Sequence, residues 1–168
     1  MKLATVPGSS PDGELVVVSA DGKRFLRAGN ALTLQQAIES WAQSFGELEA
    51  LATRLVDGEG ESTSNTRFSA PLPRAWQWLD GSAYDTHGEL MQKAFGLDPI
   101  ETDSPLMYQG MSHLFYGPRD DIPFRSEADG IDFEGEFGVI VDEVPMGTSA
   151  DDAMGHIRLI IQLNDWSL

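Results

Sequence analysis

The chain has 168 residues, of which 41% are hydrophobic and 23% charged, a composition typical of one soluble domain or of a small lobe joined to part of a larger one. Its 11 basic and 27 acidic side chains give a formal charge of −16, which repels phosphate backbones and anionic lipids, so we expect no nucleic-acid partner. The absence of cysteine excludes disulfides and thiolate sites, and no apolar run reaches the ~20 residues of a membrane helix, so we expect a cytoplasmic protein without membrane contact.

The amino-terminal part of the chain predicts a small antiparallel sheet followed by helices. Strand-forming residues occur in three short runs, at 2–6, 14–19 and 23–28. The dipeptide Asp21-Gly22 is a hairpin turn signal between the last two runs. Thr33 and Gln36 have the spacing of a capping box at the start of a helix, and we expect Gly46 to break or bend that helix before a second helical segment.

A polar stretch rich in small residues, at 57–65, predicts a flexible connection. We place the domain boundary there, with an amino-terminal α/β lobe at 1–66 and a second domain at 67–168. The elements expected in the second domain are extended chain at 68–78, a helix at 86–95, loops at 99–125, a strand at 131–142, a brief helix capped by Ser149, and a buried strand at 157–163. The predicted fold class is α+β, mainly β.

Two glutamates on the predicted strand at 131–142 carry the first indication of chemistry. Glu134 and Glu136 are two residues apart, so a strand places them on the same face about 6.5 to 7 Å from each other. Adjacent carboxylates repel unless a cation neutralises them, and oxygen ligands suit Mg²⁺, Mn²⁺ or Ca²⁺. The alternative is an ordinary solvent-facing pair, because glutamates are usually exposed.

Asp165 lies two residues after the end of the apolar run at 157–163 and beside Trp166, where full solvation is not expected. An aspartate in such a place needs a partner. A metal ion is one explanation. A hydrogen-bonded turn or a helix cap is the alternative.

A third group of polar residues lies where a predicted turn leads into the helix at 86–95. It brings Asp80, Tyr84 and His87 close together along the chain. Histidine transfers protons at neutral pH, which makes His87 the candidate acid or base. A surface or packed histidine is the alternative for His87, as it is for His113 and His156.

These motifs together resemble the fumarylacetoacetate hydrolase family, whose members cleave, isomerise or decarboxylate acylpyruvate-like compounds with the help of a metal. The similarity covers about residues 70 to 168 and is carried by the pair Asp80 and His87, the strand Asp132-Phe133-Glu134-Gly135-Glu136, the segment Asn164-Asp165-Trp166-Ser167, and Pro105 to Gly110. The resemblance implies that the second domain is part of the family's mixed β-sheet roll.

The resemblance also implies roles for individual residues. Glu134, Glu136 and Asp165 would bind Mg²⁺ or Ca²⁺, with Mn²⁺ as a further choice and Asp80 as a fourth ligand. His87 would activate water for cleavage of a carbon–carbon bond in a β-diketone or oxoacid. Substrate contacts are expected from Tyr84 and Tyr108, and the implied process is aromatic-compound catabolism such as tyrosine degradation.

The family's catalytic domain continues beyond the segment that ends at Ser167, so the resemblance implies an amino-terminal portion of such an enzyme and leaves open whether this portion is active by itself. An arginine that the family carries soon after the histidine is also missing here, with Gly96 in that region. The expected partner is a second copy in a homodimer or a complementing carboxy-terminal segment. The alternatives are a non-catalytic metal-binding or assembly subunit, an isomerase or decarboxylase of oxoacids, and an acidic domain without a metal site.

Overall fold

The computed structural model describes residues 1–98 and 104–168, so residues 99–103 of the predicted loop at 99–125 lie outside the described part of the chain. Helices and strands each account for 28% of the structure, which confirms the mixed α+β class. The chain divides into two compact units, one formed by Met1–Pro73 with Tyr116–Leu168 and the other by Arg74–Phe115. Within the described residues, none of the helices has the length and apolar character required to cross a bilayer.

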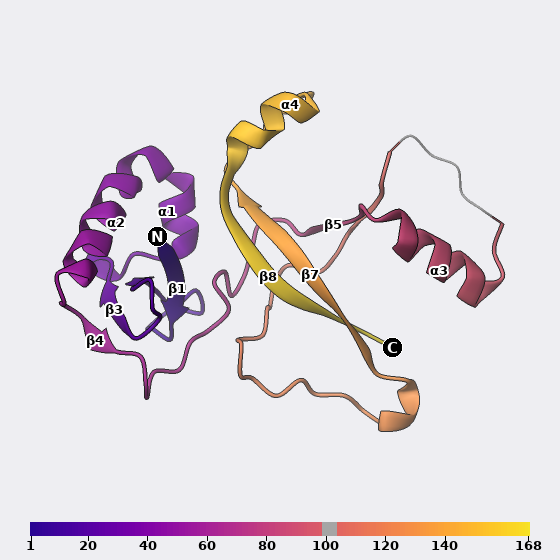
Figure 1. The fold of residues 1–168 in the computed structure, drawn as a ribbon, viewed down its shortest axis with the longest axis horizontal. Helices are drawn as coiled ribbons and strands as arrows, with labels where there is room; N and C mark the ends of the chain where they lie inside the picture. The colour runs from indigo at the N-terminus through magenta and orange to yellow at the C-terminus, as the bar shows by residue number, and fades with distance from the viewer. Residues whose placement is uncertain (99–103) are drawn as a thin grey trace. The chain divides into compact units, whose positions relative to one another are not determined.

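The first unit begins with a four-stranded antiparallel sheet (Figure 1). Its strands, in spatial order, are β1 (Lys2–Val6), β2 (Glu14–Val18), β3 (Arg24–Arg27) and β4 (Glu61–Ser62). The first three strands and the turn between β2 and β3 were predicted. Gly22 has φ +74° in that turn and donates its N–H to the carbonyl of Ser19 at 2.9 Å. Glycine fits there because it adopts positive φ without a steric cost.

The stretch at 57–65 is not simply a flexible connection, because it contains β4. Glu61 pairs with Phe25, and the N–H of Thr63 donates to the carbonyl of Lys23 at 3.0 Å. Gly60 has φ +108°, and a Cβ there would come within 2.7 Å of the Phe25 carbonyl oxygen. The polar sequence predicted a loop because backbone pairing at a sheet edge leaves little trace in side-chain type.

Two helices follow a short 3₁₀ turn, η1, and lie alongside the sheet (Figure 1). These elements are η1 (Gly29–Ala31), α1 (Leu34–Glu39) and α2 (Trp41–Val56). The capping box is confirmed: Thr33 Oγ1 accepts from the N–H of Gln36 at 3.1 Å, and Gln36 Oε1 accepts from the N–H of Thr33 at 3.0 Å. These two bonds satisfy backbone donors that the helix itself leaves unpaired.

The predicted break at Gly46 is wrong, because α2 runs through this glycine. The helices separate at Ser40 instead, where φ is −123° and ψ is 40°. Ser40 donates its hydroxyl to the carbonyl of Gln36 at 2.8 Å, a local bond of the kind that competes with helical pairing. One glycine costs a helix only about 1 kcal/mol. Burial of Leu48 and Leu51 on the core-facing side of α2 outweighs that cost.

The core of the first unit lies between the sheet and the two helices and reaches the carboxy-terminal part of the chain. Its buried members from the amino-terminal lobe are Leu15, Val17, Ala28, Leu34, Ala37, Ile38, Leu48, Leu51 and Leu55. Ile140 is only 8% exposed and belongs to the same cluster, and the half-buried Leu159 and Ile161 pack against it. The strands that carry these three residues are therefore anchored on the amino-terminal lobe.

Those strands form a long antiparallel hairpin that closes through two short helical turns (Figure 1). The elements are η2 (Glu127–Asp129), β7 (Asp132–Val141), α4 (Ala150–Ala153), η3 (Met154–His156) and β8 (Ile157–Ser167). The cap at Ser149 is confirmed, since its Oγ accepts from the N–H of Asp152 at 3.1 Å. The strand expected at 157–163 extends to Ser167, so Asp165 lies within β8 rather than after it. Pairing with β7 continues through polar residues that an apolar pattern does not mark.

The described residues of the second unit form an antiparallel strand pair and a helix. These elements are β5 (Leu79–Ser82), β6 (Leu106–Gln109) and α3 (Asp85–Phe95). The helix was predicted, and Gly96 ends it with φ +63°. Two expectations here are wrong: β6 lies within a segment predicted as loop, and Asp80 lies in a strand rather than in a turn. Cross-strand pairing stabilises β5 in spite of its turn-forming residues, and it stabilises β6 between Pro105 and Gly110.

Candidate metal centre

The β7–β8 hairpin gathers three carboxylates on one of its faces. Glu134 lies directly opposite Asp165, and Glu136 lies directly opposite Leu163, which is two residues before Asp165 on β8. Because alternate residues of a strand share a face, Glu134, Glu136 and Asp165 all project from the same side of the hairpin. We call this side the inner face, since it also carries the core residue Ile140.

Two of the inner-face carboxylates, those of Glu136 and Asp165, are close enough to share a cation. One carboxylate oxygen of Glu136 and one of Asp165 lie within 4.8 Å of each other. Glu134, Glu136 and Asp165 are half-buried, so their charges are screened less than those of fully exposed groups. Oxygen-only donors at this spacing fit a hard divalent ion such as Mg²⁺, Ca²⁺ or Mn²⁺.

Three aromatic rings pack together near the end of the hairpin that carries these carboxylates, and two of them lie on the face opposite the inner face. The ring of Trp166 lies 5.4 Å from that of Phe133 and 5.6 Å from that of Phe124. Phe133 and Trp166 are directly opposed across the strands. Such ring pairs contribute about 0.5 to 1.5 kcal/mol each beyond simple burial, so they help to hold the strand ends that carry the carboxylates.

The other predicted site residues belong to the second unit. Asp80 lies opposite Tyr108 in the β5–β6 pair, and the Tyr108 hydroxyl donates to Asp80 Oδ2 at 3.0 Å. Tyr84 precedes α3 and is 75% exposed, whereas His87 lies half-buried in the first turn of α3. The N–H of His87 donates to the carbonyl of Tyr84 at 3.1 Å. In one unit the structure brings Asp80 together with Tyr108. In the other it places three carboxylates on the inner face, with oxygens of Glu136 and Asp165 within 4.8 Å of each other.

Two family models match the chain. Residues 1–74 match the fumarylacetoacetase N-terminal domain 2, and residues 77–168 match the fumarylacetoacetate (FAA) hydrolase C-terminal domain. The chain belongs to the fumarylacetoacetate hydrolase family. No curated protein matches it. Membership makes it a hydrolase- or isomerase-type protein of a typically metal-dependent family, in agreement with the acidic residues of the hairpin.

The structure of this family member also contains a charged cluster that the sequence did not reveal. Asp142 follows β7, and its Oδ1 lies 2.7 Å from Nδ1 of His156. Its Oδ2 accepts from Nε of Arg158 at 2.9 Å and from Nη2 of the same side chain. Arg158 also donates through Nη1 to the carbonyl of Gly155 at 2.8 Å. We call Asp142, His156 and Arg158 the hairpin clasp.

The clasp changes the titration of its carboxylate. Burial by itself would raise the pKa of Asp142, but hydrogen bonds with His156 and Arg158 outweigh it and hold the pKa below its ordinary value. His156 was considered from sequence only as a surface or packed histidine. Its partner lies 14 residues earlier, across the closed end of the hairpin, so only the pairing of β7 with β8 could have identified it.

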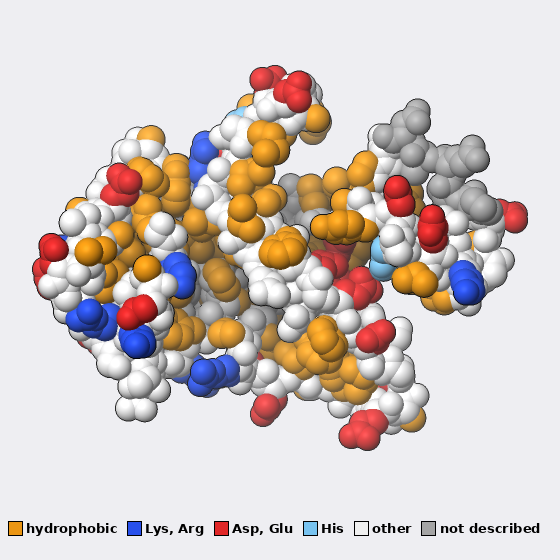
Figure 2. Space-filling view, viewed as in Figure 1, with side chains coloured by type: hydrophobic (Ala, Val, Ile, Leu, Met, Phe, Trp, Pro, Cys, Tyr) orange, Lys and Arg blue, Asp and Glu red, His pale blue; other side chains and the backbone are white. Residues whose placement is uncertain are grey.

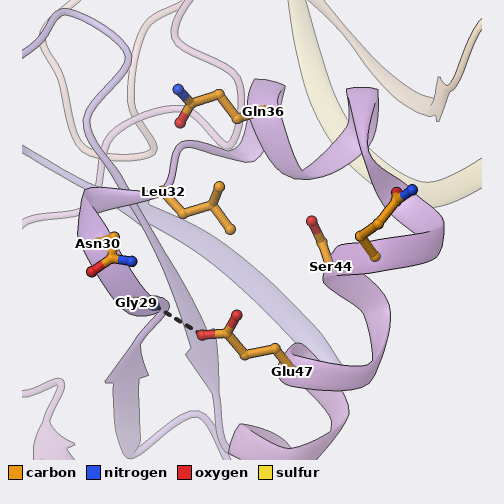
Figure 3. Close-up of a pocket in the computed structure, with 7 residues that line it drawn as sticks. Gly29, Asn30, Leu32, Gln36, Ser44 and Glu47 are labelled. Carbon is orange, nitrogen blue, oxygen red and sulfur yellow. Dashed lines mark hydrogen bonds between the residues drawn. The ribbon is translucent and has the colours of Figure 1, made fainter.

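A surface hollow of about 470 Å³ lies in the amino-terminal lobe of the first unit (Figure 3). It is lined by Gly29, Asn30, Leu32, Gln36, Gln43, Ser44 and Glu47. Glu47 is the only ionisable residue of this lining, and its Oε1 accepts from the N–H of Gly29 at 3.3 Å. None of the predicted site residues lines this hollow, so it is separate from the candidate metal centre.

Proposed function

We propose that this family member is a metal-dependent hydrolase that cleaves a carbon–carbon bond in acylpyruvate or other β-diketone substrates. The observation that carries the proposal is the inner face of the hairpin, where Glu134, Glu136 and Asp165 share one side and the oxygens of the last two lie within 4.8 Å. Three carboxylates so placed repel one another unless a cation joins them. Family membership supports a reaction of this class.

The residues fit a hard divalent cation because they offer only oxygen donors. Glu134, Glu136 and Asp165 would hold Mg²⁺ or Ca²⁺, with Mn²⁺ as a third choice, and Asp80 would be a fourth ligand. When bound, the cation supplies Lewis acidity that polarises a substrate carbonyl. Tyr108 would orient the Asp80 carboxylate through its hydrogen bond, whose length is 3.0 Å.

His87 is the proposed general base. It takes a proton from water, and the water oxygen adds to the substrate carbonyl carbon. The adjacent carbon–carbon bond then breaks, and its electron pair moves to the departing fragment as an enolate. The proton held by His87 returns to that fragment, so the products are a carboxylic acid and a ketone and the histidine is restored. Tyr84 and Tyr108 are the proposed substrate contacts.

The second copy of the chain is the proposed partner, and the outer face of the hairpin supports it. This face carries Phe133, Phe137, Val139, Ile160 and Trp166, which are 55%, 80%, 53%, 74% and 42% exposed. It carries no charged side chain between Phe133 and Val141 or between Ile160 and Trp166. These side chains expose roughly 600 Å² at the usual aromatic and aliphatic areas. Two such faces approach the lower limit of a stable interface, about 1,200 Å² in total.

The test of the activity is hydrolysis of a short acylpyruvate in the presence of Mg²⁺, followed through the loss of its enol absorbance. We expect turnover by the wild-type chain, a loss of about 10²- to 10⁴-fold in H87N, and a loss in E136Q. The matched control is E143Q, which removes the same charge from an exposed glutamate beyond the end of β7. Metal binding without turnover would favour the non-catalytic subunit, and conversion to an isomer or release of CO₂ would replace the hydrolase assignment.

A further inference from the structure

The β7–β8 ladder contains one irregularity, and it lies at the clasp. Ile140 pairs with Leu159, but the next residue, Val141, pairs with Ile157. Arg158 is therefore an extra residue on β8, as in a β-bulge. Bulges commonly redirect a side chain, and the side chain that bulges here is the one bound to Asp142.

The extra residue decides on which face Asp165 lies. Suppose that the pairing began at Val141 and Ile157 and continued toward the other end of the hairpin with no extra residue at Arg158. Asp165 would then lie opposite Phe133 instead of Glu134. A shift of one residue moves every side chain of a strand to the other face. Asp165 would then leave the inner face that carries Glu134 and Glu136, and the three carboxylates would no longer converge.

The clasp acts at the bulge itself. Asp142 binds Arg158 through one oxygen and His156 through the other, and the N–H of Asp142 donates to the carbonyl of His156 at 3.1 Å. The side chains of these three residues are only 24 to 26% exposed. Charge-assisted hydrogen bonds in partly buried surroundings are stronger than ordinary ones, so the clasp opposes withdrawal of Arg158 from the bulge.

A hairpin without the bulge would also be unfavourable for Arg158. It would place this guanidinium opposite Ile140, which is 8% exposed in the core, and burial of an unpaired charge is costly. Leu159 and Ile161 favour the observed register as well, because they pack against the core. The clasp and these apolar contacts therefore specify the same pairing.

We propose that Asp142 and Arg158 are positioning residues for the metal centre, because they hold the bulge that keeps Asp165 on the same face as Glu134 and Glu136. This inference rests on the proposed function for its metal, although the register can be measured without one. Asp142 lies eight residues beyond Glu134 along the chain, and Arg158 lies seven residues before Asp165, so we infer that their effect is transmitted through strand pairing.

The test combines Mg²⁺ affinity with a disulfide that reports the register. The full chain has no native cysteine, so an intramolecular disulfide between cysteines in place of Phe137 and Gln162, which are directly opposed, reports this pairing without competition from a native thiol. The pair is introduced into the wild-type chain and into D142A, D142E and D151N. Asp151 is exposed in α4 of the same connection and serves as the matched control.

We expect D142A to bind Mg²⁺ about 10-fold more weakly, as for residues that orient metal ligands, and to lose the cross-link. D142E should recover both properties, and D151N should retain them. An unchanged affinity and cross-link in D142A would overturn the inference, as would weaker binding with the cross-link intact. If the wild-type chain binds no Mg²⁺, the proposed function fails, whereas a cross-link that depends on Asp142 still supports the role of the clasp in the register.

Discussion

At the scale of single residues, Asp142 has the most defined environment of the carboxylates described. Burial would raise its pKa, but hydrogen bonds with His156 and Arg158 outweigh this effect and lower it. A carboxyl group whose pKa is lower in the folded than in the unfolded chain stabilises the fold wherever it is ionised. The stabilisation is complete above the unfolded pKa and disappears as the pH falls through the folded one.

This sign predicts how D142N changes with pH. At pH 7 the variant should lose about 1 to 3 kcal/mol of unfolding free energy, because two charge-assisted hydrogen-bonding partners are lost. The difference from the wild type should shrink as the pH falls below about 4, where the unfolded carboxyl group becomes protonated. Urea denaturation at pH 7 and pH 3 measures it, with D151N as the control. A difference that stays constant between these pH values would contradict the assignment.

At the scale of elements, α2 shows that packing outweighs the intrinsic preference of one residue. Gly46 lies inside the helix, and a Cβ built there meets nothing within 4 Å. Gly22 has equally open surroundings but φ +74°. The two glycines therefore separate the effect of space from the effect of backbone conformation.

We expect G46A to stabilise the protein by about 0.5 to 1 kcal/mol, because alanine loses less backbone entropy than glycine when it enters a helix. G22A should instead destabilise it, by about 1 kcal/mol, because alanine disfavours positive φ. Thermal or urea unfolding of the two variants provides the comparison. Equal effects of the two substitutions would show that Gly46 is not helical in solution.

The sequence predicted the elements whose signals are local. The capping box at Thr33 and the strand that carries Glu134 and Glu136 depend on residues a few positions apart. The extension of β8 to Ser167 and the strand β6 depend on pairing between distant segments. Single-sequence patterns do not contain that information, so Asp165 was placed after the strand rather than within it, although the residue itself was chosen.

At the scale of the whole molecule, the outer face of the hairpin predicts self-association. Phe137 is 80% exposed there, whereas Val56 is 84% exposed at the end of α2, outside this face. Sedimentation velocity should find a dimer for the wild-type chain and for V56S, and a weaker dimer for F137S. A monomer at every concentration would contradict the second copy as partner and would favour a complementing segment.

The candidate site was only partly predictable from the sequence, because strand pairing between distant segments determines which of its residues meet. The convergence of Glu134 and Glu136 follows from the spacing of residues on a strand. Asp165, Asp80 and His87 were chosen from their sequence neighbours, and the family motifs assigned their roles. The partners of these residues were not predictable, because Asp80 meets Tyr108 through a strand pair that spans 28 positions. The bulge at Arg158 likewise has no sequence signature, yet it sets the face on which Asp165 lies.

The central claim, that the inner face of the hairpin binds a divalent cation, is tested most directly by calorimetric titration of the full chain with Mg²⁺, Ca²⁺ and Mn²⁺. We predict saturable binding by the wild-type chain and by E143Q, and its loss in E136Q and in D165N. An absence of binding heat at near-millimolar metal, or equal affinity in all four proteins, would contradict the claim.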